Sequence, residues 1–169
     1  MNQRRSFLKS SVVIASALSV PAFAKAAQTT KVEPVERALG LYNTHTGESL
    51  RSIFWAEGQY IPDALKDINK LLRDHRSNTI AEMDPKLLTL LNRVSDKFGG
   101  RDVLHVISGY RSPETNRKLA AASGGVARHS MHLEGKAIDI RLPGRDLAQL
   151  HKAALAVGGG GVGYYPSSQ

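Results

Sequence analysis

The sequence contains no cysteine among its 169 residues, so no disulfide framework can stabilise the fold. It also has no run of about 20 strongly apolar residues, the length that a membrane-spanning helix needs. No internal repeat is present, which excludes repeat architectures. One domain of this size can bury a core without such aids. Stability must therefore come from packing or from a bound metal.

The N-terminal segment has the composition of an export signal. Paired arginines, Arg4 and Arg5, precede an uncharged stretch, residues 10–23, that is too short and too rich in serine and alanine to span a bilayer stably. The stretch ends at Ala24 in an A-x-A cleavage sequence. We therefore expect residues 1–24 to be a signal peptide that the twin-arginine translocase recognises and that is removed in the periplasm. An uncleaved N-terminal anchor is the alternative.

The chain is basic, with a formal net charge of +8, and it stays basic if Arg4, Arg5 and Lys9 leave with the signal. A positive surface suits an acidic polymer such as cell-wall material, anionic lipid or nucleic acid, and charge alone does not choose among them. We expect residues 25–37 to form an extended leader and residues 38–169 to form one domain.

The first half of this domain is expected to contain a hairpin and two helices. Apolar runs at 39–42 and 50–55 flank a polar turn that includes His45, the arrangement of a β-hairpin. Pro62 begins one helix, and Asp84 caps the next. Apolar residues at steps of three and four give each helix a buried face: Ile61, Leu65, Ile68 and Leu72 in the first, and Leu87, Leu88, Leu91, Val94 and Phe98 in the second.

The second half of the domain alternates strands and helices. The hydrophobic pattern predicts strands at 103–107, 137–141 and 162–165, and helices at 113–122 and 145–157. A Gly- and Ser-rich loop follows the first of these helices, and four glycines end the second. The predicted fold class is α+β, in a single domain.

A histidine and an aspartate in this second half are candidate metal ligands. If the chain is extended from Ala137 onward, Ala137 and Asp139 share one face of a strand, and Asp139 points into a cleft. Gly135 permits the sharp turn that brings His132 over the same face. Both side chains are ordinary zinc ligands, and a catalytic zinc takes three protein ligands and a water. A capping or hydrogen-bonded pair is the alternative interpretation of this spacing.

Other polar residues have simpler interpretations beside a functional one. Arg111 lies in a turn, where it can serve the site or pair with Glu114 as a surface arginine. Glu134 has the chemistry of a general base, but its place in a turn favours simple solvation. His105 lies inside an apolar strand and is expected to be structural. His129 is expected to be exposed.

Three motifs carry a resemblance to a known family. The segment from Ser130 to Asp139 has the pattern S-x-H-x-x-G-x-A-x-D, with Ser108-Gly109-Tyr110-Arg111-Ser112 before it and Gly160-Gly161-Val162-Gly163-Tyr164-Tyr165-Pro166 after it. In these motifs the sequence resembles the M15-type zinc peptidases of the bacterial cell wall, and among them the murein endopeptidase K branch. The similarity extends to residues 41–48 and to the helices that follow, so it covers nearly all of the chain after the signal.

This resemblance implies the α+β fold shared by D,D-peptidases and the Hedgehog signalling domain, with a small antiparallel sheet and flanking helices. It implies a zinc ion, Zn2+, held by His132 and Asp139. It also implies that Arg111 lies near the scissile carbonyl, where a fixed cation stabilises the developing oxyanion. The implied reaction is hydrolysis of the peptide cross-links of peptidoglycan, and nucleic acid is not an expected partner.

The resemblance further implies a third zinc ligand, a histidine on a strand that follows the Tyr-Tyr-Pro segment in relatives. The sequence ends at Gln169, where this strand is expected to begin, so we expect a domain that lacks its last strand. A site with two protein ligands binds zinc weakly. The alternatives to a murein endopeptidase are therefore an inactive truncated homologue and a module that binds peptidoglycan without cleaving it.

Overall fold

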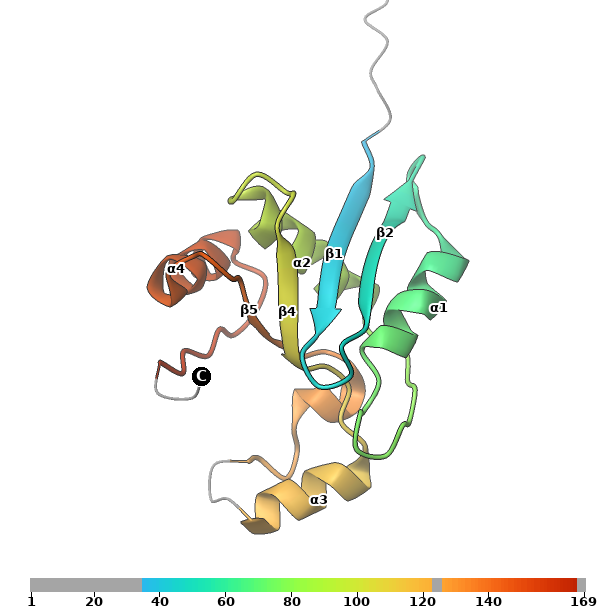
Figure 1. Cartoon of the computed structure of the whole chain (residues 1–169), viewed down its shortest axis with the longest axis vertical. Helices are drawn as coiled ribbons and strands as arrows, with labels where there is room; N and C mark the ends of the chain where they lie inside the picture. The colour runs from blue at the N-terminus through green and yellow to red at the C-terminus, as the bar shows by residue number, and fades with distance from the viewer. Residues whose placement is uncertain (1–34, 123–125, 167–169) are drawn as a thin grey trace, which may run out of the picture. The chain divides into compact units, whose positions relative to one another are not determined.

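A five-stranded sheet is the framework of residues 35–122 and 126–166, which the computed structural model describes (Figure 1). The strands lie in the order β3-β2-β1-β4-β5. They are β1 (Arg37–Asn43), β2 (Ser49–Ala56), β3 (Gln59–Tyr60), β4 (Val103–Ser108) and β5 (Asp139–Arg141). The β1 and β4 strands are parallel, and the other neighbouring pairs are antiparallel. The predicted α+β class is confirmed, with one parallel pair that makes the sheet mixed.

The described residues also form α1 (Pro62–Leu71), α2 (Pro85–Asp96), α3 (Pro113–Ala122), the short 3₁₀ helix η1 (Met131–Glu134) and α4 (Leu147–Val157). Both predicted proline starts are confirmed, and the Asp84 carboxylate accepts a hydrogen bond from the Lys86 amide at 2.8 Å. The α1 helix packs on β2 and α2 packs on β1. The core between them includes Leu39, Leu41, Phe54, Ile68, Leu72, Leu88, Leu104 and Val106. Among these described helices, none has the length and apolar character to cross a membrane.

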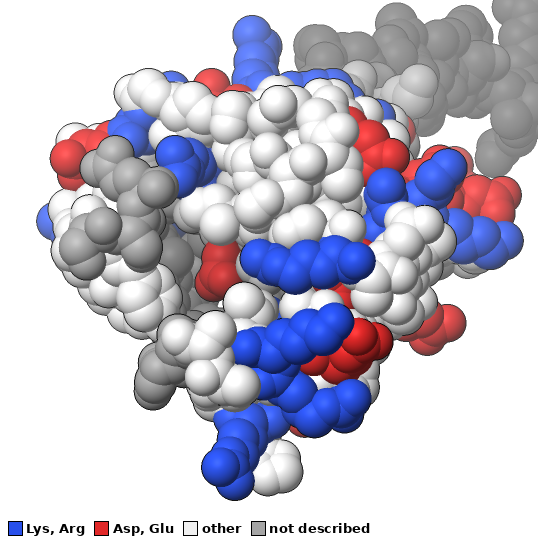
Figure 2. Space-filling view, turned by 60° about the horizontal axis from the view of Figure 1, so that its bottom comes forward, with Lys and Arg blue, Asp and Glu red and all other residues white. Residues whose placement is uncertain are grey.

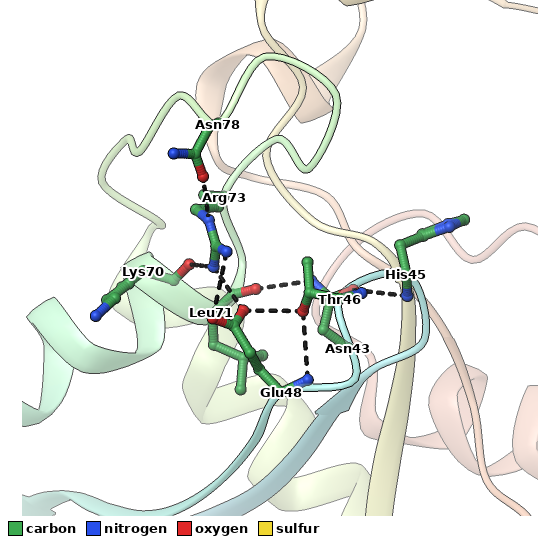
Figure 3. Close-up of polar contacts among 8 residues, drawn as sticks. All are labelled: Asn43, His45, Thr46, Glu48, Lys70, Leu71, Arg73 and Asn78. Carbon is green, nitrogen blue, oxygen red and sulfur yellow. Dashed lines mark hydrogen bonds and ion pairs between the residues drawn. The ribbon is translucent and has the colours of Figure 1, made fainter.

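The predicted hairpin is confirmed as β1 and β2, and its turn is bonded to both neighbours. The Asn43 side chain accepts hydrogen bonds from the amides of His45 and Thr46 at 2.9 and 3.2 Å, and it donates to the Leu71 carbonyl at 2.9 Å (Figure 3). The His45 ring donates from Nε2 to the Ile107 carbonyl at 3.0 Å. The turn therefore ties the end of α1 to the end of β4, where the candidate site begins.

The strand predicted at 137–141 begins only at Asp139. The residues before it are taken up by η1 and by Gly135, which ends η1 in the left-handed conformation. The pairing of β5 with β4 also shifts register between Val106 and Ser108, so that Asp139 lies opposite Ser108. Asp139 is thus placed by a turn and an irregular pairing, and the regular alternation expected from Ala137 does not apply.

The strand predicted at 162–165 is wrong: in the described residues this segment is irregular and lies outside the sheet. An extended segment becomes a strand only when a neighbouring strand takes its backbone hydrogen bonds. Here Tyr164 instead stacks on the His151 ring of α4, with ring centroids 4.7 Å apart. The α4 helix starts later than predicted because Asp146 caps its first turn.

Candidate metal and catalytic site

The loop between β4 and α3 carries the candidate arginine and lies directly against the end of α1. The Tyr110 amide donates a hydrogen bond to the Leu72 carbonyl at 2.8 Å. A Cβ atom at Gly109 would lie 2.5 Å from the same carbonyl oxygen, closer than the two atoms can approach, so only glycine fits there. This contact fixes the position of the backbone from which the Arg111 side chain projects.

The η1 helix presents His132, which is buried. Gly135 ends η1 with φ at +64°, and a Cβ there would collide with the Glu82 carbonyl oxygen, so glycine is required for the turn predicted at this position. The His132 Nδ1 atom lies 2.8 Å from the Gly109 carbonyl oxygen. Because a carbonyl only accepts, Nδ1 carries the proton, and Nε2 of the neutral ring keeps its lone pair. That tautomer leaves Nε2 available to a metal.

Asp139, at the start of β5, lies beside this Nε2 atom. Its Oδ2 atom lies 3.5 Å from His132 Nε2 and 3.8 Å from Arg111 Nη2. Two ligands of one tetrahedral zinc ion, with bonds of about 2.0–2.1 Å each, lie about 3.4 Å apart. The separation of Nε2 and Oδ2 therefore fits a shared metal ion. The structure brings the three predicted site residues together, and their roles stay predictions.

The Arg111 guanidinium is mostly buried but weakly bonded. It donates to Asn116 Oδ1 at 3.4 Å and to Ser108 Oγ at 3.3 Å, both near the long limit for a hydrogen bond. Its Nε atom is buried and has no acceptor among the described residues. The alternative surface pair with Glu114 is not formed, because Glu114 bonds to a lysine on its own helix at 2.7 Å. Arg111 therefore faces the site with hydrogen-bonding capacity unused.

The domain that holds this site is similar to proteins of one peptidase family. The Peptidase M15 family model described as peptidoglycan L,D-endopeptidase MepK matches residues 31–169. The chain belongs to the MepK family. The peptidoglycan L,D-endopeptidase MepK of Escherichia coli (strain K12) is 42% identical over 168 residues, which cover 99% of this chain and 90% of the relative. The probable peptidoglycan L,D-endopeptidase MepK of Haemophilus influenzae is 40% identical over 136 residues, covering 80% of this chain and 73% of the relative. No solved structure matches the chain.

The donors of the site fit zinc, the metal on which M15 peptidases such as the MepK family generally depend. An imidazole nitrogen and a carboxylate oxygen are both common zinc ligands, and here they lie at a suitable separation. Within residues 35–122 and 126–166, no group of three or more His, Cys, Asp or Glu side chains is arranged to hold a metal. Among the described residues of this MepK family member, His132 and Asp139 are thus two candidate protein ligands.

The remaining candidates do not join His132 and Asp139 in a metal-binding group among the described residues. Glu134 is exposed, and a hydrogen bond from Lys136 at 2.8 Å lowers the pKa of its carboxyl group. A carboxylate with a lowered pKa is a weaker general base, which supports the expectation of simple solvation. His129 is exposed as expected. His105 is half-buried in β4, with its ring centroid 4.7 Å from that of Tyr42, and has the structural setting predicted for it.

Asp74, just after α1, is a buried carboxylate that the sequence analysis missed. Its Oδ2 atom accepts a hydrogen bond from the Ser112 amide at 2.9 Å, and its Oδ1 atom accepts one from the Arg76 amide at 3.0 Å. Burial raises the pKa of Asp74, but hydrogen bonds from Ser112 and Thr115 outweigh burial and hold the pKa well below its usual value. The one local signal was the spacing of Asp74 and Arg76, which suits an Asx turn.

Asn116 is a second missed residue, buried on α3 behind the arginine. Its side-chain amide donates to the Ala127 and Arg128 carbonyls at 3.1 and 3.3 Å, while its oxygen accepts from Arg111. One side chain thus joins α3, the segment before η1 and the guanidinium. An asparagine on the buried face of a helix indicates a hydrogen-bonding role, but local sequence does not identify its partners.

Proposed function

We propose that the protein is a zinc-dependent peptidoglycan L,D-endopeptidase that hydrolyses peptide cross-links of the cell wall. The observation that carries this proposal is the convergence of His132 Nε2 and Arg111 Nη2 on Asp139 Oδ2, at 3.5 and 3.8 Å, in a member of the MepK family. The names of the relatives supply the substrate class.

Each site residue has a distinct task in this proposal. His132 and Asp139 would hold zinc, and the Gly109 carbonyl keeps the imidazole proton on Nδ1. When bound, zinc supplies a Lewis acid that lowers the pKa of a coordinated water toward neutrality. Negative charge develops on the oxygen of the scissile amide during attack. The guanidinium of Arg111, whose Nη2 atom lies 3.8 Å from Asp139 Oδ2, would stabilise that charge.

The charge of the surrounding surface supports an acidic substrate. Lys and Arg side chains gather on the face that carries α3 (Figure 2). Arg117, Lys118 and Arg128 are exposed there. The peptides of peptidoglycan carry free carboxylates, and a basic surface raises their local concentration near the site.

The test is digestion of purified peptidoglycan by the purified protein, with the products separated by muropeptide chromatography. We expect loss of L,D cross-linked dimers, dependence on added zinc, and inhibition by a chelator. The Asp139→Asn variant, which keeps the shape of the side chain, should be inactive. Zinc-independent cleavage, or full activity of Asp139→Asn, would contradict the proposed mechanism.

One observation favours a second candidate function, binding of peptidoglycan without hydrolysis. The described residues bring together two candidate metal ligands and not three, and each missing ligand weakens zinc binding. Sedimentation with purified sacculi, run beside the digestion, separates the two functions. Binding with no release of products at saturating zinc would support the second candidate and contradict the first.

We also propose that the protein is exported to the periplasm by the twin-arginine translocase. The signal predicted at 1–24 lies outside the described residues, so its support is the Arg4-Arg5 pair and the A-x-A sequence that ends at Ala24. N-terminal analysis of the periplasmic protein should find Lys25, or one of the alanines just after it, as the first residue. Replacement of both arginines by lysine should block export, and unimpeded export would point to the general secretory route.

A further inference from the structure

Asp74 is a buried charged residue to which the proposed chemistry of the metal site assigns no direct role. Asp74 is 2% exposed. Among the described residues, it forms no ion pair with a Lys, Arg or His side chain. Burial of a carboxylate is unfavourable unless hydrogen bonds compensate for the lost water. The hydrogen bonds that compensate here come from the Arg76 amide and from the start of α3.

The carboxylate contacts the chain at the residue that follows the candidate catalytic arginine. Ser112 donates its amide to Asp74 Oδ2 at 2.9 Å, and its own Oγ accepts from the Thr115 amide at 3.2 Å, so Ser112 caps α3. The negative charge of Asp74 also lies at the N-terminal end of α3, where the helix dipole favours it. Asp74 therefore fixes both the first turn of α3 and the residue that joins it to Arg111.

The backbone of Arg111 is held from two sides. On one side, Leu72 and Asp74 accept hydrogen bonds from the amides of Tyr110 and Ser112. On the other side, the Arg111 amide donates to the His132 carbonyl at 3.1 Å. The guanidinium itself makes only long contacts, so the side chain depends on its backbone anchor for position.

We infer that Asp74 is a positioning residue: through Ser112 it holds Arg111 so that the guanidinium stays beside Asp139 and His132. This inference rests on the proposed function, because the position matters for catalysis only if Arg111 stabilises the transition state. Asp74 is separated from Ser112 by 38 positions in the chain. Its carboxylate therefore links the end of α1 to the loop that carries Arg111.

A double-mutant cycle tests the inference with a cross-linked muropeptide as substrate. The Asp74→Asn change keeps the size of the side chain but puts an N–H donor where an acceptor is needed. It should lower kcat about tenfold with KM nearly unchanged, and it should cause no further loss in an Arg111→Ala background, because Asp74 acts through Arg111. Equal losses in the two backgrounds, or a loss in KM alone, would overturn the inference.

Two further variants guard against a simple folding defect. Asp146→Asn makes the same chemical change at another helix cap, in α4, where the carboxylate accepts from the Ala148 and Gln149 amides at 2.9 and 3.1 Å. It should leave kcat unchanged. If Asp74→Asn does not fold, Ser112→Ala removes the hydroxyl from the same link and should give a smaller loss of kcat, again absent in the Arg111→Ala background. A full loss in that background would overturn the inference.

A measurement that needs no activity separates failure of this inference from failure of the proposed function. In ¹H–¹⁵N spectra, the buried Arg111 Nε–H should give a signal that exchanges slowly with water, and Asp74→Asn should shift it and speed its exchange about tenfold. The corresponding signal of Arg145, whose Nε donates to Asp102 Oδ2 at 3.1 Å, should not change. If the wild type hydrolyses nothing, the proposed function fails while this spectrum still decides the role of Asp74. An unchanged Arg111 signal in Asp74→Asn would overturn that role.

Discussion

Arg73 and Arg111 are two equally buried arginines with opposite degrees of hydrogen bonding. Their side chains are 14% and 13% exposed, and each lies beside a carboxylate that is 42% exposed. Arg73 bonds to Glu48 at 2.6 Å, to Asn78 at 2.7 Å and to the Lys70 carbonyl at 2.7 Å (Figure 3). The guanidinium contacts of Arg111 are 3.3 to 3.8 Å long, and its Nε has no acceptor among the described residues.

The difference separates an arginine that holds the fold from one that we propose serves a ligand. A buried donor without an acceptor is unfavourable, and Arg111 retains one at its Nε atom. Arg73 joins the turn after β1 to the end of α1 and makes four side-chain hydrogen bonds with its five N–H donors. Arg111 is anchored by its backbone, and its long side-chain contacts suit the role that we propose for it.

The largest expected effect follows from removing a predicted metal ligand. His132→Ala or Asp139→Ala should lower cross-link hydrolysis by more than about 100-fold, since loss of an outer hydrogen-bond partner alone costs 10- to 100-fold or so. Zinc titration should show that both variants also lose affinity for zinc. Glu134→Gln, at an exposed carboxylate paired with Lys136, is the control and should leave both measurements unchanged. Undiminished zinc binding by His132→Ala would remove the metal assignment.

Replacing each of the two arginines with lysine sharpens the comparison. Arg111→Lys should lower kcat about 100-fold, the size expected for a lost oxyanion donor, with little change in the free energy of unfolding. Arg73→Lys should do the reverse and cost about 1–2 kcal/mol of stability, because a lysine cannot replace the paired contacts with Glu48. Kinetics and urea unfolding measure the two effects. A result in which Arg73→Lys lost the greater share of kcat would erase the distinction between the residues.

The contact that joins the two regions gives an intermediate effect. Gly109→Ala places a Cβ 2.5 Å from the Leu72 carbonyl oxygen, so the loop must move away from α1. We expect a loss of about 1–3 kcal/mol in unfolding free energy and about tenfold in kcat. Gly160→Ala is the matched control, because a Cβ there meets no atom within 4 Å. Equal behaviour of the two variants would show that the close approach at Gly109 has no structural consequence.

Local signals predicted the parts of the fold that depend on local physics. The hairpin and the helices that begin near Pro62 and Pro85 follow from hydrophobic spacing and from capping chemistry, and all three are confirmed. The strand expected at 162–165 is wrong because a strand also needs a partner, which no local pattern supplies. The start of β5 at Asp139 depends on an irregular pairing with Ser108.

The candidate site shows the same limit. Family resemblance in the S-x-H-x-x-G-x-A-x-D segment selected His132 and Asp139, and the structure brings them within 3.5 Å. Asp74 was missed because its partner Ser112 is 38 positions away, and Asp74 itself lies outside the three motifs that carry the family resemblance. Residues that position a catalytic group through the backbone leave only weak traces in the sequence.

The smallest expected effect concerns pH and the fully bonded pair of Arg73 and Glu48. The hydrogen bond from Arg73, followed by that from Thr46, lowers the pKa of Glu48. Because the folded pKa is depressed, the carboxylate contributes stability above its unfolded pKa of about 4.3, and this contribution is lost as the pH falls below that value. Glu48→Gln should therefore reduce the free energy of unfolding by about 0.5–1 kcal/mol at pH 7, since the pair is partly exposed.

The difference between wild type and Glu48→Gln should shrink toward zero in urea titrations as the pH falls through the range of about 4 to 3. Glu114→Gln provides the control, because Glu114 pairs with Lys118 on the surface of α3 and both side chains are exposed. Its effect should be smaller and should weaken further with added salt. A Glu48→Gln difference that stayed constant down to pH 3 or so would show that the pair contributes through shape and not through charge. Arg73 would then differ from Arg111 only in packing, and the contrast between a bonded structural arginine and an available catalytic one would lose its electrostatic basis.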